Sequence, residues 1–271
     1  MSLMHVYLTK LMRNRKQVFL TTALAAILAA AIGFPFILIV AGIISLTTLS
    51  QSQSEGVRLL LFSLGVIVLS KIFFEQANAY SIGVVFFMLV PVWFLAILIG
   101  FNYSAWDQLK TALGVALISI ALLYLFVDDI ANWKIEIFGK LIGMEPSVFP
   151  PEIKNPENAL SPYNPIFIGD LLTVVMLIVW LGGNYLGRWW QAILYKPGGF
   201  AKEFHALRIG REIAIPALLV ILISLNYTGT WRLVANDMAI PVLAMYWLGG
   251  VALLHFFFAQ WQIHKVFVML F

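Results

Sequence analysis

Long apolar runs separated by short polar segments dominate the hydrophobic pattern of this chain. A helix that crosses the hydrocarbon core of a bilayer needs about 20 mostly apolar residues, and its backbone groups must be hydrogen-bonded within the helix. The pattern therefore predicts an all-α, polytopic transmembrane bundle of about eight spans, in which residues 1–271 form a single integral membrane domain. The spans are expected near 17–33, 35–51, 57–74, 81–101, 110–127, 165–187, 212–227 and 238–258.

The composition excludes a soluble globular protein. Hydrophobic residues make up 62% of the 271 residues and charged residues 11%, whereas a soluble domain carries about 25% charged residues. The mean hydropathy is +0.93. The chain has no cysteine, which excludes disulfides, thiolate metal sites and cysteine nucleophiles.

Charge distinguishes two arrangements of the first apolar region. Residues 18–50 fit either one overlong helix or two helices with a turn at Pro35, which lacks a backbone donor and favours a turn. With two helices and a cytoplasmic N-terminus, the inside segments hold 12 of the 17 lysines and arginines and only four acids. Because one fused helix would break this positive-inside asymmetry, we predict a hairpin. The 12 basic residues are Lys10, Arg13, Arg15, Lys16, Arg58, Lys110, Arg188, Lys196, Lys202, Arg208, Arg211 and Lys265.

Two long loops are amphipathic. The outer loop, 128–164, begins with a predicted interfacial helix whose apolar stripe is Ile130, Trp133, Ile137 and Leu141, with Lys134 and Lys140 outside this stripe. Its second half is rich in proline and is expected to be extended. This loop either caps the bundle or forms a binding lid. The inner loop, 188–211, predicts a short basic helix with Phe200, Phe204 and Leu207 on one face. It serves either as a membrane anchor or as a docking surface.

Two later spans resemble each other. The segment 170–187 aligns without a gap to 237–254 through an aspartate and a shared Trp-Leu-Gly-Gly. Both segments run inward, so this similarity predicts a parallel repeat of the kind seen in transporter folds. The apolar end, 266–271, is too short to span a membrane and indicates either a tail that dips into the membrane or a truncated chain.

Ionisable residues within spans are candidates for function because they are costly in a membrane. Lys71 and Glu75 lie near the outer end of the third span, as an i,i+4 pair or as part of a site. Asp170 lies at a similar depth in the sixth span, and a contact with Lys71 would form the polar floor of an outward-facing pocket. Asn184 and His255 are interpreted as interhelical hydrogen-bonding groups.

Motifs for enzymes, metals and nucleic acids were not found in the sequence. The chain has no His-Glu-x-x-His, Gly-x-Ser-x-Gly or Walker A sequence, so we predict no enzyme activity, no cofactor and no metal. Asp128 and Asp129 form a weak candidate for magnesium. An enzyme that acts on lipid would have only these two acids, Asp170 and His255 to use. The basic residues follow the inner membrane face, which gives nucleic-acid binding no support.

Small residues at helical spacing indicate close helix packing. In the first span Ala25 and Ala29 form one ladder and Ala26 and Ala30 a second, and Gly183 and Gly187 repeat the spacing in the sixth span. Such faces let helix backbones approach closely. They pack either inside the chain or against another subunit.

The inner loop resembles a known family. Its sequence Arg188-Trp189-Trp190-Gln191-Ala192, followed by Lys196-Pro197-Gly198-Gly199-Phe200 and Glu203-Phe204-x-x-Leu207-Arg208, is similar to the YybS-like family of bacterial predicted membrane proteins, a domain of unknown function. That family is grouped distantly with the substrate-capture subunits of energy-coupling-factor transporters and with the rod-shape membrane protein MreD. In the capture subunits, an Ala-x3-Ala face on the first helix docks the coupling subunit, and Ala25, Ala26, Ala29 and Ala30 match this pattern.

The resemblance implies a multi-pass protein of the bacterial inner membrane and leaves two functions open. The first is a transporter-like subunit that captures a small solute near Lys71, Glu75 and Asp170 and needs a separate ATPase and coupling partner. The second is a non-transporting envelope scaffold that recruits other membrane proteins through its loops. The residues expected to dock a partner are Ala25, Ala26, Ala29, Ala30, Arg188, Trp189, Trp190, Gly198, Gly199, Phe200, Phe204 and Arg208.

Overall fold

The fold was analysed in a computed structural model that describes the backbone of residues 3–100, 104–130, 132–134, 136–137, 165–207, 209–226 and 229–261. The side chains of residues 3, 105, 165–170 and 212 lie outside the described part. The described residues form helices and turns and no strand, which confirms the all-α prediction. The predictions for the proline-rich segment, Lys140, Leu141, Arg208 and the end 266–271 lie outside the described residues.

The chain forms two compact units, and the single integral membrane domain expected from the sequence stays a prediction. Unit 1 contains the described residues of 1–103, 137–146 and 175–200, and unit 2 those of 104–136, 147–174 and 201–271. Each unit therefore combines segments that are distant in the sequence, and we describe each by itself.

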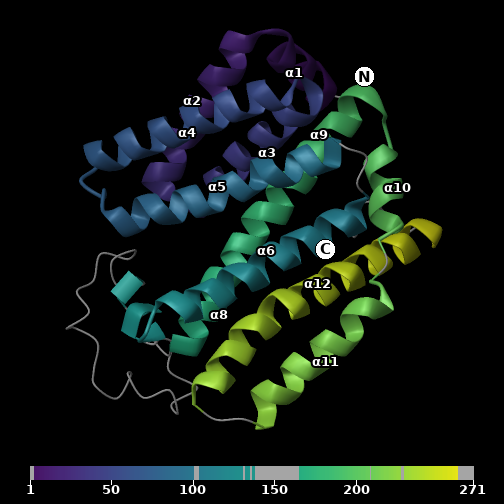
Figure 1. Ribbon diagram of the computed structural model, residues 1–271. Coiled ribbons are helices and arrows are strands. Elements are labelled where there is room, and N and C mark those ends of the chain that lie inside the picture. Colours follow the sequence, from purple (N-terminus) through teal and green to yellow (C-terminus); the bar gives the residue numbers. More distant parts are fainter. Residues whose placement is uncertain are drawn as a thin grey trace. The chain divides into compact units, whose positions relative to one another are not determined.

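Unit 1 is built around one buried helix. Its elements are α1 (Leu3–Arg13), α2 (Arg15–Ile32), α3 (Phe34–Ser50), α4 (Gln53–Phe73), α5 (Ala79–Gly100), the end of α8 (Pro165–Leu177), the π-helix η3 (Ile178–Gly182) and α9 (Gly183–Tyr195). Helix α3 contacts α2, α4, α5 and α9 (Figure 1). All side chains from Ala41 to Thr48 are buried, so α3 forms the core of this unit.

The predicted hairpin between the first two apolar helices is confirmed. Helix α2 ends at Gly33, whose φ of +98° suits a residue without a Cβ, and Pro35 lies in the first turn of α3. The two helices then pack against each other. The proline fits there because the first turn of a helix has no internal acceptor for its missing N–H.

Helix α9 packs closely along α3 through its two glycines. A Cβ on Gly183 would lie 2.5 Å from the Cβ of Ala41, and a Cβ on Gly187 would lie 2.6 Å from that of Ser45. Four residues further along each helix, the Gln191 amide donates to the Leu49 carbonyl at 2.9 Å. The order of these contacts shows that α3 and α9 run in the same direction, as the predicted second and sixth spans must.

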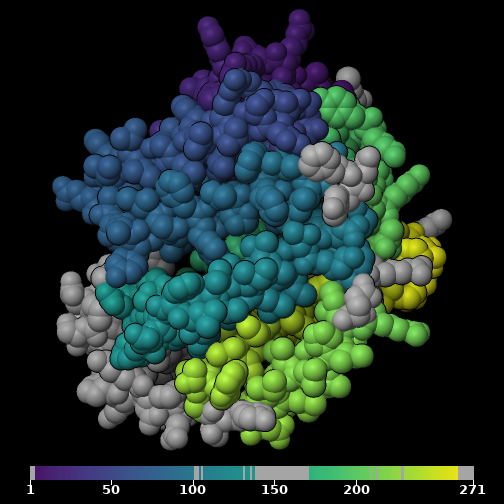
Figure 2. Space-filling view, in the orientation of Figure 1, coloured from purple at the N-terminus to yellow at the C-terminus, as the bar shows by residue number. Residues whose placement is uncertain are grey.

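Unit 2 contains α6 (Ala105–Phe126), most of α8 and of α10 (Gly199–His205), α11 (Arg211–Asn226) and α12 (Thr230–Gln260). Helix α12 contacts both α6 and α11, and α11 and α12 lie side by side (Figure 2). A capping box between Ser104 and Asp107 begins α6. Helix α12 begins eight residues before the predicted span, so Asp237 lies inside a helix.

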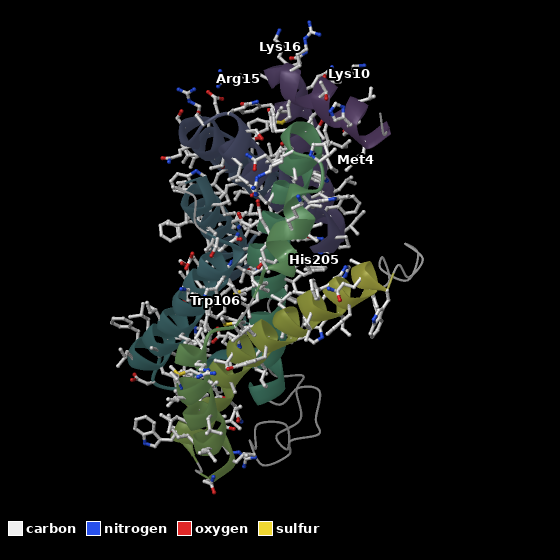
Figure 3. The ribbon with its side chains drawn as sticks, turned by 90° about the vertical axis from the view of Figure 1, so that its right-hand side faces the viewer. Met4, Lys10, Arg15, Lys16, Trp106 and His205 are labelled. Carbon is white, nitrogen blue, oxygen red and sulfur yellow. The ribbon has the colours of Figure 1, made fainter. Side chains whose placement is uncertain are left out.

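Six of the described helices are long and apolar enough to cross a membrane, which makes the chain a multi-pass membrane protein by length and composition. The shorter apolar helices are 34–50 and 213–226. They coincide with the second and seventh predicted spans, so the count of eight stays a prediction. At one end of unit 1, Lys10, Arg15 and Lys16 lie together around the break between α1 and α2 (Figure 3).

The inner loop is shorter than predicted. Residues 188–195 are the last two turns of α9 and do not form a loop. A short helix follows after Pro197 and Gly198, whose φ is +80°, and this agrees with the predicted helix around Phe204. The α9 extension arises because Trp190 and Gln191 find packing partners on α3.

Candidate functional site

A buried ion pair lies in unit 2. The ammonium of Lys134 donates to Oδ2 of Asp237, and these two residues are only 2% and 3% exposed. The Tyr124 hydroxyl donates to the same Oδ2 at 2.8 Å. The Lys134 ammonium also lies 5.8 Å from the centre of the Tyr124 ring, within the range of a cation–π contact. We call these three residues the Asp237 site.

Three elements supply the Asp237 site. Tyr124 lies in the last turn of α6. Lys134 lies on a helical segment comprising residues 130, 132–134 and 136, which we call the Lys134 segment. Asp129 caps this segment, because its Oδ1 accepts from the Asn132 backbone N–H at 3.1 Å. Asp237 lies seven residues into α12, about 10 Å along the helix axis at 1.5 Å per residue.

The Asp237 site has one buried acceptor that the described residues do not satisfy. Oδ1 of Asp237 is buried and has no hydrogen-bond partner among them. Four residues later α12 contains Pro241, which has no N–H to donate to the backbone carbonyl of Asp237. One carboxylate oxygen of Asp237 is therefore unsatisfied, and its backbone carbonyl lacks the usual helical donor.

Such an arrangement is costly. Removing two charges from water costs several kcal/mol per ion, and the pair offsets this cost only when its hydrogen bonds are complete. Charged groups inside membrane proteins commonly mark ligand or ion sites for this reason. The neutral pair together with its open acceptors can hold a polar ligand by hydrogen bonds, whereas it contains no nucleophile–base arrangement.

The structure separates the residues of the predicted pocket. Lys71 is half-buried in the last turn of α4, and Glu75 is exposed beyond the helix end with a φ of +57°. The interpretation as a helical i,i+4 pair is wrong, because α4 ends at Phe73, and no ion pair joins these two described residues. Asp170 lies on α8, and its side chain lies outside the described part, so the Lys71–Asp170 contact stays a prediction.

Asn184 joins three helical elements of unit 1, as the interpretation as an interhelical hydrogen-bonding group predicts. It is fully buried, and its Oδ1 accepts from the Ser45 hydroxyl at 3.0 Å. Its Nδ2 donates to the carbonyls of Val92 at 3.1 Å and Trp180 at 2.8 Å. His255, by contrast, packs against the Phe204 ring, with 5.8 Å between ring centres.

The Trp180 indole satisfies a carbonyl that a proline leaves free. Pro91 lies inside α5 and cannot donate to the carbonyl of Phe87 four residues earlier. The indole Nε1 of Trp180 donates to this carbonyl at 3.0 Å. Trp180 lies in η3, and π-helical turns of this kind often occur at functional sites. Here the turn aims two side chains, Trp180 and Asn184, at α5.

The small-residue ladders pack inside unit 1. Ala25, Ala26, Ala29 and Ala30 are at most 9% exposed, and α2 contacts α3 and α4. These contacts occupy the face that the resemblance assigns to a coupling subunit. Of the two alternatives for these ladders, internal packing is therefore the one that the structure supports.

The remaining docking residues differ in accessibility. Trp189 is 43% exposed and Gly198 is exposed. Trp190 contacts Gly42 of α3, Arg188 donates to Gln191, and Phe200 lies 6.0 Å from the Tyr185 ring. Gly199 is buried. The exposed surface that remains for a partner is therefore smaller than the sequence predicts.

The amphipathic face of the inner helix is also partly covered. Phe204 packs against His255 of α12 within unit 2, and Leu207 is 7% exposed. Lys202 is exposed on the opposite side. Phe204 of the apolar stripe therefore packs on a neighbouring helix, and the contact of the inner helix with the membrane surface stays a prediction.

Sequence reasoning missed the Asp237 site. The sequence places Lys134 outside the apolar stripe of the outer-loop helix, but the structure buries this lysine against Asp237. Asp237 was noticed only as the counterpart of Asp170 in the repeat. A usable signal was present, since an isolated acid within reach of an apolar span needs a basic partner. The repeat itself stays a prediction, and its two tryptophans differ: Trp180 is 1% exposed and Trp247 66%.

The acidic pair of the outer loop has a structural role. Asp129 caps the Lys134 segment and also accepts from the Asn132 side chain, and Asp128 is exposed. Among the described residues, no group of three or more histidines and acids is arranged to hold a metal ion. The capping role accounts for Asp129 of this pair.

No protein-family model, curated protein or solved structure matches this chain. The resemblance to the YybS-like family therefore stays a prediction. The apolar helices define a multi-pass helical membrane protein.

Proposed function

We propose that this chain is a transporter-like membrane subunit that binds a small solute at the Asp237 site. The observation that carries the proposal is the buried Lys134–Asp237 pair, whose carboxylate keeps one oxygen without a partner among the described residues. A purely structural ion pair gains most when all its acceptors are used. An unused acceptor in a buried position is what a ligand-binding site requires.

The subunit works with a separate ATPase and a coupling protein in the bacterial inner membrane. This part rests on the resemblance of the inner loop and on the lack of a Walker A sequence in the chain. The proposed solute site is the Asp237 site. It replaces the site that the sequence predicts at Lys71, Glu75 and Asp170, because Lys71 and Glu75 are not arranged as a pair. Coupling through the alanine ladders is not part of the proposal, since internal contacts cover them.

Intact-complex mass spectrometry of the full-length protein in mild detergent tests this proposal. We expect a small molecule retained by the wild type and by Asp128→Asn, a matched change of an exposed acid, and lost from Asp237→Asn. Co-purification with an ATPase would add support. A preparation without any retained small molecule, with Asp237→Asn fully active in cells, contradicts the proposal.

An envelope scaffold is the second candidate, and the exposure of Trp189 favours it. Exposed tryptophans serve both as membrane anchors and as contacts in interfaces. If the chain is a scaffold, we expect Trp189→Ala and Lys202→Glu to abolish its cellular function and Asp237→Asn to have only a small effect on that function. The solute-binding function predicts the reverse order, so the same three variants separate the two functions.

A further inference from the structure

We infer that the Asp237 site takes an electrically neutral small solute that donates hydrogen bonds, an inference that rests on the function proposed above. Two independent features of the site carry it. One is the set of acceptors that remain open at Asp237, and the other is the charge that is already balanced there.

The groups that remain open at Asp237 are oxygen atoms, which accept hydrogen bonds and do not donate them. Oδ2 already receives the Lys134 ammonium and the Tyr124 hydroxyl. Oδ1 has no partner among the described residues, and Pro241 leaves the Asp237 carbonyl without its helical donor. A ligand that completes this residue therefore brings one or two N–H or O–H groups, because a carboxylate is acceptor-only.

The charge of the site selects a neutral ligand. Lys134 and Asp237 form a pair with no net charge, and both are nine-tenths buried or more. Glu136, two residues after Lys134, is half-buried and has an interaction partner of its own. The next ionisable side chains along these elements, Asp128, Asp129 and Arg232, are exposed and screened by water. A cation or an anion at Oδ1 would therefore leave one unbalanced charge in a region of low dielectric, where such a charge is costly.

Lys134 adds a complementary donor. Its ammonium carries three N–H groups, and one of them is used by Asp237. A solute that donates to Asp237 and offers one oxygen to Lys134 satisfies both members of the pair. Small amides and hydroxylated amides have this combination of groups, so we assign the ligand to that chemical class.

Saturation-transfer NMR of the full-length protein in lipid nanodiscs tests the class with four probes of similar size. Glycolamide is neutral and donates hydrogen bonds, glycolate is an anion, protonated glycinamide is a cation, and methyl acetate is neutral without a donor. We expect saturation of glycolamide, and at least about tenfold weaker binding of the other three, the factor that one lost or unbalanced hydrogen bond produces.

Two variants locate the binding at Asp237. Pro241→Ala supplies the missing N–H to the Asp237 carbonyl, and it suits a helix better than proline does; we expect glycolamide affinity to fall about tenfold while the fold is kept. Pro216→Ala makes the same change inside α11 and should leave affinity unchanged. Asp237→Asn turns the open acceptor into a donor and should abolish the signal.

The outcomes separate the ligand class from the proposed function. If glycolate or protonated glycinamide is saturated and this signal is lost in Asp237→Asn, the inference that the ligand is neutral is overturned. Solute binding at this site would then still be supported. Glycolamide saturation that is the same in Pro241→Ala and Asp237→Asn also overturns the inference, since the probe then binds elsewhere. Saturation by none of the probes overturns it as well, and the retained solute of the wild-type protein then decides the proposed function separately.

Discussion

Buried polar residues of this protein are of two kinds, which differ in how completely they are hydrogen-bonded. Asn184 uses its oxygen and its amide nitrogen in three hydrogen bonds to Ser45, Val92 and Trp180. Asp237 leaves one carboxylate oxygen open. A fully satisfied amide stabilises helix packing, whereas an open carboxylate costs stability unless something binds to it. This difference is why we assign function to Asp237 and structure to Asn184.

Breaking the ion pair from one side should destabilise the protein strongly. Lys134→Met leaves the Asp237 carboxylate buried without its cation, and we expect a loss of about 3–5 kcal/mol in the free energy of unfolding. Lys134→Gln combined with Asp237→Asn removes both charges and should recover most of the loss. Reversible unfolding in mixed detergent micelles measures both, with Asp128→Asn as the neutral control. A single Lys134→Met variant as stable as the wild type would show that the pair does not form.

At the scale of single helices, proline residues create acceptors that other elements satisfy or leave open. Pro91 frees the Phe87 carbonyl, and Trp180 donates to it. Pro241 frees the Asp237 carbonyl in the same way. Prolines are tolerated inside membrane helices because neighbouring side chains can replace the lost hydrogen bond. On α12, Pro241 thus removes a helical donor from the same residue whose carboxylate oxygen is unsatisfied.

Trp180 and Pro91 should be energetically coupled. Trp180→Phe leaves the Phe87 carbonyl buried without a donor, at a cost of about 1–3 kcal/mol in addition to the lost packing. In a Pro91→Ala background, the new backbone N–H supplies that donor, so the same change should cost less. A double-mutant cycle on unfolding free energies measures this coupling. Additive effects of the two changes would refute the role of the indole N–H.

The contact between α3 and α9 depends on glycine. Gly187→Ala places a Cβ 2.6 Å from that of Ser45, and the helices must separate, which we expect to cost about 1–3 kcal/mol. Gly65→Ala is the matched control in α4, where a Cβ meets no atom within 4 Å. It should stabilise the helix by up to about 1 kcal/mol. Unfolding free energies that change equally for both variants would contradict the close contact.

At the scale of the whole molecule, the direction of the spans is the property that charge predicts. The chain has no cysteine, so single cysteines can be introduced as probes. The exposed positions Ser54, Gln76 and Lys202 lie in three different connecting segments. With eight spans, Ser54 and Lys202 face the cytoplasm, and Gln76 faces the opposite side.

Labelling with a membrane-impermeant maleimide measures this topology in intact cells. We expect Gln76→Cys to react from outside, and Ser54→Cys and Lys202→Cys to react only after the cells are opened. Reaction of Lys202→Cys from outside would show that an odd number of crossings separates residues 54 and 202. The parallel direction of α3 and α9 would then conflict with the membrane orientation of unit 1.

The chain's helices follow from the sequence alone. Apolar length, a glycine and proline between α2 and α3, and polar residues at the helix ends are local properties, and they predicted helices and the hairpin close to their observed places. The boundaries were less predictable where a polar residue has a distant partner. Helix α12 starts earlier than expected because Asp237 is neutralised by Lys134, and α9 runs on because Gln191 bonds to α3.

The candidate site was decided by the tertiary structure. Lys134 and Asp237 are 103 residues apart, and Trp180 and Phe87 are 93 apart, so no local pattern connects either pair. A helical periodicity shows which residues share a face, but not which other helix covers that face. The sequence therefore places Lys134 outside the apolar stripe of its helix, whereas the fold buries it. The sequence determines the membrane helices, because their length and polarity are local, whereas the packing of helix faces alone determines which charges meet.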